Sequence, residues 1–590
     1  MKQRDYKRLY NKYKAKYLLL TKTANNSYTL RKIDKLDDKT LGSKTLDSKT
    51  LDSNNIDILG DTTQPDWPSI SNKVRASVVQ VHSISYTIDP EHPYIQPAND
   101  QARGSGFIIH SSSDKILIMT NSHVVEEAKT VYIRTEQTHN EELKANVIGI
   151  CPSKDLALIE LDKEEIKKLD PLPPTLKFCD DRIYMDSIPV MVAGYPLGKE
   201  NLKFTTGVLS GNQNEYDVDH DRFMSYLQIS AAVNPGNSGG PLFNSNGEVI
   251  GVNSAGFTFS QNIAYAIPTH IIISVLNDLL NTPNKIVSVF NYGFDWNNTS
   301  PELLKNYSNC NMTGIYINKV NDANVLKLKV GDILHKLELY DVTSIKDIWK
   351  LLIRKLNSNI NKLYSKGDKV TAVIDNFGVV KIYDTSNNET MWSMNKKKLN
   401  INELLDAITN KSQVKVTVSR NKKVLSYVTN ADNVENTGVV SILPIYKPID
   451  WEICLGCCFT PLNIPLVKIS GIKKRNSDIE DLHYFLIDKY RNKQWIALTH
   501  IFPTSDTYKS HILKNNEIGV ITHINNIKVC TMDELRSALM KVKNKYITID
   551  FENGKRLVVS DIKGNARKID KSIYEENKIK LTPFAEKWTS

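Results

Sequence analysis

The feature that most constrains this 590-residue chain is a glycine-rich run, Asn234–Phe243, which reads Asn-Pro-Gly-Asn-Ser-Gly-Gly-Pro-Leu-Phe. It places one hydroxyl, that of Ser238, inside a turn built mainly from small residues. A serine that attacks a carbonyl needs an exposed Oγ and backbone N–H groups aimed at the developing oxyanion. We therefore expect Ser238 to be a nucleophile and Gly236, Asn237 and Ser238 to form an oxyanion hole, with the N–H groups of Gly236 and Ser238 as donors. The alternative is an ordinary turn, because Gly, Ser and Asn often cluster in turns.

Two upstream segments supply candidate partners for this serine. An apolar run that begins at Ile116 leads to His123, which predicts a strand that ends at this histidine on the rim of a sheet. Asp155 opens a second apolar run, Asp155–Leu161, which has the character of a buried strand. A nucleophilic serine needs a base, and the base needs an orienting carboxylate. The chain thus predicts a catalytic triad in the order His123, Asp155, Ser238, although a surface histidine or a strand-start aspartate would explain either partner alone.

These segments resemble the HtrA/DegP serine proteases. The similar motifs are Thr-Asn-Ser-His-Val-Val at 120–125, Asp-Leu-Ala-Leu at 155–158 and Gly-Asn-Ser-Gly-Gly at 236–240. The resemblance is strong from Trp67 to Leu280, and the later residues look most like the plant-type Deg subgroup. It implies a mostly β protein, with a chymotrypsin-like double β-barrel protease domain followed by two α+β PDZ-like domains.

The resemblance also implies how the site is switched. The residue before the nucleophile is Asn237, where trypsin-like zymogens carry an aspartate that pairs with a freed amino terminus. We therefore expect loop rearrangement in Gly211–Tyr226 and Asn253–Asn262 instead of propeptide cleavage. The first of these loops carries acidic residues around His220, and a solvated loop explains them better than a metal site, because one histidine among scattered aspartates lacks a ligand frame. No metal or cofactor is expected.

The substrate pocket is expected between the segments Ile229–Asn234 and Gly251–Gly256, lined by Ala232, Val233 and Ser254. Neither segment carries a charge that would pair with a basic side chain. A small or medium apolar residue such as Val, Ala or Leu is the expected choice before the cleaved bond. Such a pocket separates near-isosteres by only about 1–3 kcal/mol per methylene, so broad selectivity follows.

The length of the chain exceeds what one hydrophobic core supports, and it predicts several domains. We expect a basic amino-terminal segment and disordered linker over 1–65, followed by the protease domain over 66–284. The first PDZ-like domain is expected over 285–430, with an insertion near 357–401. The second PDZ-like domain and a carboxyl-terminal tail fill 431–590. In the first PDZ-like domain the carboxylate-binding loop would lie near Tyr292–Trp296, where Asp295 would repel a carboxylate.

Cysteine use and the amino-terminal segment bear on the compartment. Seven cysteines over a long chain do not form a disulfide framework, and Cys454–Phe459 reads as a buried strand with core thiols, with a zinc or redox site as the alternative. The apolar patch Tyr17–Leu20 is too short for a secretory or membrane-spanning segment. We expect an intracellular protein. The compartment would be a host cytoplasm or virion if the chain is of giant-virus origin, as its amino-terminal pattern and its many Asn, Ile and Lys residues indicate, and an organelle or nucleus if it is plant-like.

The leading hypothesis is an ATP-independent serine endopeptidase that cleaves unfolded or damaged proteins by an acyl-enzyme mechanism. Its expected partners are unfolded or misfolded proteins and copies of itself, in a trimer or a multiple of one; no specific nucleic acid and no membrane span are expected. The alternative is a chaperone or scaffold that binds client peptides through the PDZ-like modules and rarely forms the triad. A nucleic-acid role is weaker, because the net charge of +10 is modest and the folded regions lack a basic, aromatic stripe.

Overall fold

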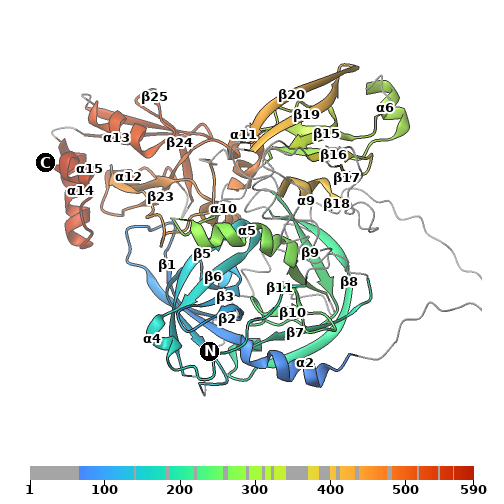
Figure 1. Ribbon diagram of the computed structural model, residues 1–590. Helices are drawn as coiled ribbons and strands as arrows, with labels where there is room; N and C mark the ends of the chain where they lie inside the picture. The colour runs from blue at the N-terminus through green and yellow to red at the C-terminus, as the bar shows by residue number, and fades with distance from the viewer. Residues whose placement is uncertain are drawn as a thin grey trace, which may run out of the picture. The chain divides into compact units, whose positions relative to one another are not determined.

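The computed structural model describes residues 65–590, apart from 139–140, 180–185, 218–221, 257–262, 283, 288–291, 308–311, 321–323, 340–369, 384–398, 407–411, 432–437, 475–480, 514–516, 543–544 and 562–563 (Figure 1). The basic segment and the linker expected at the amino end lie outside the described residues.

Six antiparallel strands close into a first barrel in the order β1-β2-β3-β6-β5-β4. Its strands are β1 (Val78–Thr87), β2 (Ala98–Ser111), β3 (Ile116–Thr120), β4 (Ala128–Arg134), β5 (Leu143–Cys151) and β6 (Leu156–Leu161). Short helices precede or join them: α2 (Trp67–Val74), η1 (Arg75–Ser77), α3 (Ser122–Val125), η2 (Pro152–Lys154) and α4 (Lys163–Ile166). The prediction that a strand ends at His123 is wrong, since β3 stops at Thr120 and His123 lies in α3.

A second closed barrel follows in the order β10-β11-β12-β9-β8-β7. Its elements are β7 (Pro189–Gly194), η3 (Pro196–Gly198), β8 (Lys203–Asp217), β9 (Arg222–Ile229), β10 (Pro241–Phe243), β11 (Val249–Gly256), β12 (Ala264–Pro268) and the closing helix α5 (Thr269–Asn281). One hydrophobic cluster contains Phe107 of the first barrel, Met191 and Val252 of the second, and Leu279 of α5. The barrels therefore share a core, and the predicted double-barrel fold is confirmed.

The segment Gly211–Tyr226 differs from the expected loop. Most of it belongs to a hairpin of β8 and β9, paired from Leu209↔Ile229 to Asp217↔Arg222. The tip with His220 lies outside the described residues. Of the second expected loop, residues 253–256 belong to β11 and 257–262 are outside the described part. The sequence does not indicate these paired strands, because the hairpin is largely polar and lacks the long apolar run that identifies a buried strand.

The next region is an eight-stranded sheet. Its elements are β13 (Phe294–Asn297), α6 (Pro301–Tyr307), β14 (Ile315–Val320), β15 (Ile333–Leu339), β16 (Val370–Ile374), β17 (Val379–Tyr383), β18 (Leu399–Asn400), α9 (Ile401–Asp406), β19 (Ser412–Arg420) and β20 (Lys423–Ala431). The stretch expected as an insertion, 357–401, supplies β16, β17 and β18 to this sheet. Asp295, expected to repel a peptide carboxylate, forms an ion pair with Lys319 at 3.5 Å.

The carboxyl-terminal module is built on a seven-stranded sheet in the order β21-β22-β23-β24-β26-β27, with β25 beside β24. The strands are β21 (Glu452–Cys454), β22 (Cys457–Pro461), β23 (Ile496–Ile501), β24 (Gly519–Ile524), β25 (Ile527–Lys528), β26 (Tyr546–Phe551) and β27 (Arg556–Ser560). The helices are α10 (Ile464–Lys474), η5 (Leu482–Leu486), α11 (Asp488–Arg491), α12 (Asp506–Lys509), α13 (Met532–Met540), α14 (Asn565–Glu576) and α15 (Pro583–Thr589).

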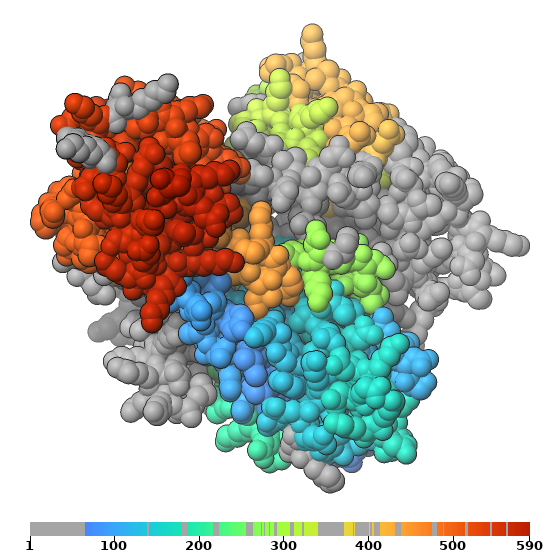
Figure 2. All heavy atoms as spheres, turned by 90° about the vertical axis from the view of Figure 1, so that its left-hand side faces the viewer, coloured from blue at the N-terminus to red at the C-terminus, as the bar shows by residue number. Residues whose placement is uncertain are grey.

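Two features of this module differ from the sequence-based expectations. The run Cys454–Phe459 is a hairpin instead of one strand, with Leu455 and Gly456 as its turn. Its three cysteines are buried free thiols, as expected, and burial raises the pKa of each. The expected tail is also folded, because Phe584 and Trp588 belong to the core cluster of the sheet. In the space-filling view the last residues, in red, form one packed group (Figure 2).

Candidate active site

The first barrel supplies a histidine and a carboxylate in contact. His123 Nδ1 lies 2.8 Å from Asp155 Oδ1 and 3.0 Å from Oδ2, and the backbone N–H of His123 donates to Oδ1 at 3.1 Å. The His123 side chain is 39% exposed and that of Asp155 is 21% exposed. Burial would raise the pKa of Asp155, but the charge and hydrogen bonds of His123, with a further bond from Ser254, hold it below its usual value. The pair is thus an ionised carboxylate that orients an accessible imidazole.

Local structure explains the position of Asp155. It follows η2 with φ 52°, a left-handed conformation that is uncommon outside glycine but that aspartate adopts more readily than most residues. Asn121, the residue between β3 and α3, donates from Nδ2 to the carbonyl of Asp155 at 2.8 Å. This bond ties the histidine-bearing segment to the aspartate-bearing turn.

The second barrel brings its own hydroxyls to this pair. Ser254 on β11 donates to Asp155 Oδ2 at 2.6 Å. Ser238 Oγ donates to the backbone carbonyl of Ser254 at 2.8 Å. The three residues predicted as a triad therefore converge at the junction of the barrels, with Ser254 connecting two of them. Sequence reasoning placed Ser254 in the substrate pocket and missed its bond to Asp155.

The turn around Ser238 depends on glycine. Gly236 has φ 101°, and a Cβ there would lie 2.4 Å from the carbonyl of Tyr195. Gly239 has φ 85°, and a Cβ there would lie 2.1 Å from the carbonyl of Ser105. Both separations are far below van der Waals contact, so larger residues would displace the turn.

Ser105 on β2 braces this turn from the first barrel. Its backbone N–H donates to the carbonyl of Ser238 at 2.8 Å, and its Oγ donates to the carbonyl of Gly236 at 2.7 Å. Ser105 was not singled out from the sequence. Its position between Gly104 and Gly106 could have identified it, because glycine inside a strand often marks a place where another backbone approaches closely.

The other predicted site residues differ in how far they are buried and in what they contact. Asn237 is buried, its N–H donates to the carbonyl of Asn234 at 3.0 Å, and its side chain lies against Gly194. Ala232 is exposed, and Val233 packs partly buried on the core of the second barrel. Ser254 is only 6% exposed, and its hydroxyl is engaged by Asp155.

A second carboxyl group adjoins the predicted triad and was not singled out from the sequence. Glu126 follows α3 and accepts a hydrogen bond from Ser122 Oγ at 3.0 Å. Burial, and then the charge of Asp155, raise the pKa of Glu126, while the charge of His123 opposes this. The site therefore holds two carboxyl groups whose pKa values are pushed apart, a pattern common at catalytic sites.

Comparison with known protein families supports a protease domain in the first half of the chain and a PDZ domain near its carboxyl end. The family description "Trypsin-like peptidase domain" matches residues 104–252, a span that contains His123, Asp155 and Ser238. The description "PDZ domain" matches residues 446–582. The chain therefore contains a trypsin-like peptidase domain and a PDZ domain, and it is similar to the HtrA/DegP serine proteases.

Individual relatives agree with this assignment. A "Probable periplasmic serine endoprotease DegP-like" of Pseudomonas putida is 36% identical over 182 residues, which are 30% of this chain and 35% of that protein. The "Serine protease Do-like HtrB" of Bacillus subtilis is 30% identical over 291 residues, 47% of this chain and 60% of that protein. The chain thus spans between about a third and three fifths of the curated relatives it matches. These relatives are bacterial and give no support to a viral origin.

One solved structure, "HtrA-type protease AlgW with decapeptide", shares 20% identity with a TM-score of 0.40, over 62% of this chain and 98% of that one. Within the described residues no helix is both long and apolar enough to cross a membrane.

Proposed function

We propose that the chain is an ATP-independent serine endopeptidase that cleaves unfolded or damaged proteins. The observation that supports this most directly is the continuous set of contacts from Ser238 through Ser254 to Asp155 and His123, built from both barrels. These contacts link three side chains that are far apart in sequence and are of the types that acyl transfer requires.

In the proposed mechanism His123 is the base that activates Ser238. The Ser238 hydroxyl has one proton, which is donated to the carbonyl of Ser254, so the side chain must turn toward His123 Nε2 before attack. Its Oγ then adds to the substrate carbonyl, and the protonated imidazole returns the proton to the leaving amine. Water hydrolyses the acyl-enzyme by the same route, while Asp155 keeps the imidazole oriented.

The oxyanion of each tetrahedral intermediate would be held by the N–H groups of Gly236 and Ser238. Each such donor contributes on the order of 3 kcal/mol in serine proteases. Ser105 supports this arrangement, because it binds the carbonyls of the same two residues and so fixes the direction of the turn.

The substrate preference is proposed to be small or medium apolar residues, with Ala232, Val233 and Ser254 at the pocket. The absence of charge along this wall and the burial of Ser254 support the proposal. A peptide series that varies only the residue before the cleaved bond tests it: Val, Ala and Leu should be cleaved, and Lys and Asp should be cleaved far more slowly. Faster cleavage after Lys would refute the pocket.

The nucleophile is tested with Ser238→Ala and a fluorophosphonate probe. The wild type should be labelled at Ser238 and should digest unfolded casein, whereas the variant should do neither and should keep its thermal unfolding midpoint. Cleavage of casein by Ser238→Ala at the wild-type rate would show that another group is the nucleophile.

A scaffold that rarely forms its triad is the second candidate, and the orientation of the Ser238 hydroxyl toward Ser254 favours it. The same labelling experiment separates the two functions. Binding of unfolded casein without any labelling would favour the scaffold. We further propose a trimer or a multiple of one, which sedimentation with and without casein tests.

A further inference from the structure

The carboxyl-terminal module contains a carboxylate that is bound like a ligand. Asp570 on α14 is 0% exposed. Its Oδ1 accepts a hydrogen bond from the backbone N–H of Gly456 at 2.7 Å, and its Oδ2 accepts from the N–H of Leu455 at 2.8 Å. Trp588 Nε1 also donates to Oδ2, at 2.8 Å. No lysine or arginine in the described part of the chain forms an ion pair with Asp570, so these N–H groups offset the cost of burying it.

The geometry of the turn explains why two successive N–H groups point at one carboxylate. Leu455 has φ 57° and Gly456 has φ 70°, so both residues are left-handed. Successive N–H groups in such turns form a concave nest that binds anions. For leucine this conformation is unfavourable by about 1–2 kcal/mol, and the tight hairpin between β21 and β22 imposes it.

The strand that leads to this turn is at the edge of the sheet. Among the described strands β21 pairs with β22 alone, so its outer edge has no strand neighbour there. From α14 the hydroxyl of Tyr574 reaches that edge, where it accepts from the N–H of Ile453 at 3.2 Å and lies 3.5 Å from its carbonyl oxygen. Ala585 of α15 also packs in the hydrophobic cluster of Ile453. Tyr574 and Asp570 lie one turn apart on α14, so one helix face bonds the strand and its terminal turn together.

PDZ domains recognise peptides through these two kinds of group, a sheet edge for the peptide backbone and a nest for the terminal carboxylate. We propose that the outer edge of β21 and the Leu455–Gly456 turn form a site for a carboxyl-terminated peptide, which this chain fills with its own α14. Asp570 stands in the place of the terminal carboxylate and Tyr574 in the place of the peptide backbone. The helix is therefore a resident ligand that closes the module to outside carboxyl termini.

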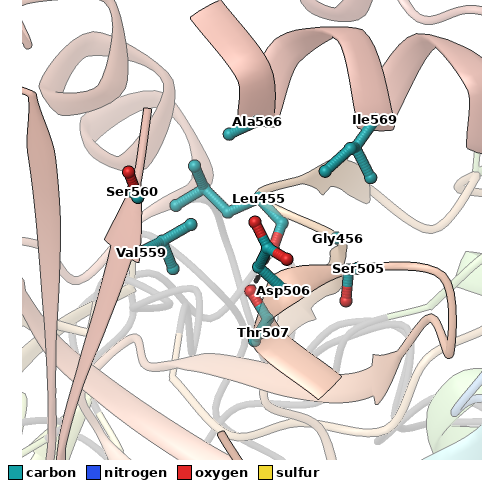
Figure 3. Close-up of a pocket in the computed structure, with 9 residues that line it drawn as sticks. All are labelled: Leu455, Gly456, Ser505, Asp506, Thr507, Val559, Ser560, Ala566 and Ile569. Atoms are coloured by element: carbon teal, nitrogen blue, oxygen red, sulfur yellow. Dashed lines mark hydrogen bonds between the residues drawn. The ribbon is translucent and has the colours of Figure 1, made fainter. Parts of the chain in front are cut away.

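The space beside the Leu455–Gly456 turn is not completely filled, as expected for a ligand-binding site. A small pocket adjoins Leu455 and Gly456, walled by residues 505–507 at the start of α12, by Val559 and Ser560 of β27 and by Ala566 and Ile569 of α14 (Figure 3). Removal of the Asp570 carboxyl group would leave room beside this pocket with its N–H donors intact. A small carboxylate should therefore be able to replace the missing group.

Chemical rescue tests the nest in the full chain, with Ser238→Ala present in every sample to prevent self-digestion. Asp570→Ala should lower the thermal unfolding midpoint, and sodium formate should raise it again in a saturable way that sodium chloride does not reproduce. The matched control is Glu575→Ala, an exposed carboxylate on the same helix, whose midpoint should respond to both salts alike. If formate and chloride changed the unfolding midpoint of Asp570→Ala equally, the claim that the Leu455–Gly456 turn binds carboxylates would be refuted.

Peptide binding tests the role of α14 as resident ligand. A fluorescent peptide that ends in valine is titrated against the Asp570→Ala chain and its parent, once with a free carboxylate and once with an amide end. The variant should gain a binding event absent from the parent, about tenfold or more tighter for the free carboxylate than for the amide, as hydrogen bonds to a charged group imply. Identical binding to both chains would overturn the proposal.

A second variant covers the case in which Asp570→Ala does not fold. Asp570→Ser keeps one acceptor and leaves most of the same room, and it is carried through both experiments. Loss of folding in both variants, with no recovery in formate, would show that Asp570 is a structural anchor and not a replaceable ligand. These outcomes are independent of the proposed peptidase activity, because the nucleophile is absent throughout.

Discussion

Asp155 and Asp570 are two carboxylates of one chain, each held by three hydrogen-bond donors, yet their pKa values move in opposite directions. The donors to Asp155 are the imidazole and backbone N–H of His123 and the hydroxyl of Ser254. The donors to Asp570 are two backbone N–H groups and an indole. Burial raises both values, but the pKa of Asp155 ends below its usual range, while that of Asp570 reaches about 6.

The two pKa values differ because only Asp155 has a hydrogen-bond partner that can become positively charged. His123 can carry a positive charge beside Asp155, whereas the donors to Asp570 are neutral. A hydrogen bond to a neutral donor offsets part of the cost of burying a charge, and a cationic partner offsets more of it. The candidate active site therefore keeps Asp155 ionised, which its proposed orienting role needs, whereas Asp570 in the carboxyl-terminal module has a pKa of about 6 and is more easily protonated.

The largest effect is expected from removing the charge of the first carboxylate. Asp155→Asn should lower kcat/KM for casein peptides about 10⁴-fold, because an amide favours the wrong imidazole tautomer. Asp114→Asn, an exposed residue between β2 and β3, is the control and should keep wild-type activity. An Asp155→Asn enzyme within tenfold of wild type would show that this carboxylate does not orient the base.

The second test uses pH and concerns Asp570. Its folded pKa of about 6 lies above the unfolded value of 3.8, so the folded state binds the extra proton between these values. The contribution of Asp570 to stability should therefore be most favourable below about pH 4 and should weaken as pH rises through 6, by up to about 3 kcal/mol. This contribution is measured at each pH as the difference in hydrogen exchange of β21 between the parent chain and Asp570→Ala. A difference that is constant from pH 4 to 7 would contradict the assignment.

A smaller effect is expected where the two barrels meet. Ser254→Ala removes one of the donors to Asp155 but keeps the carbonyl that binds Ser238, so it should cost about 1.5 kcal/mol, or roughly tenfold in kcat, with little change in KM. Ser254→Thr, which keeps the hydroxyl, should recover most of the activity. A loss of activity through KM alone would show that the Ser254 hydroxyl contributes to substrate binding only and does not act through Asp155.

Short, local signals predicted most of the protease domain. The glycine run around Ser238 and the apolar strand that follows Asp155 carry their structural meaning within a few residues, because turns and strands are set by neighbouring side chains. The same logic misplaced His123 at a strand end, since a one-turn helix such as α3 is too short to leave a periodic pattern. It also treated 357–401 as an insertion, although β16 and β17 complete a sheet.

By itself the sequence determined which residue types occupy each turn, and its motifs were enough to predict a nucleophilic serine in a glycine-rich loop and, through the family resemblance, a double-barrel fold. Only the tertiary structure decided which donors reach each carboxylate. Ser254 binds Asp155 across 99 positions of sequence, and Asp570 binds Leu455 across 115. Such bonds depend on how whole strands and helices pack, and no local pattern in the chain encodes the distance between two groups that approach only after folding.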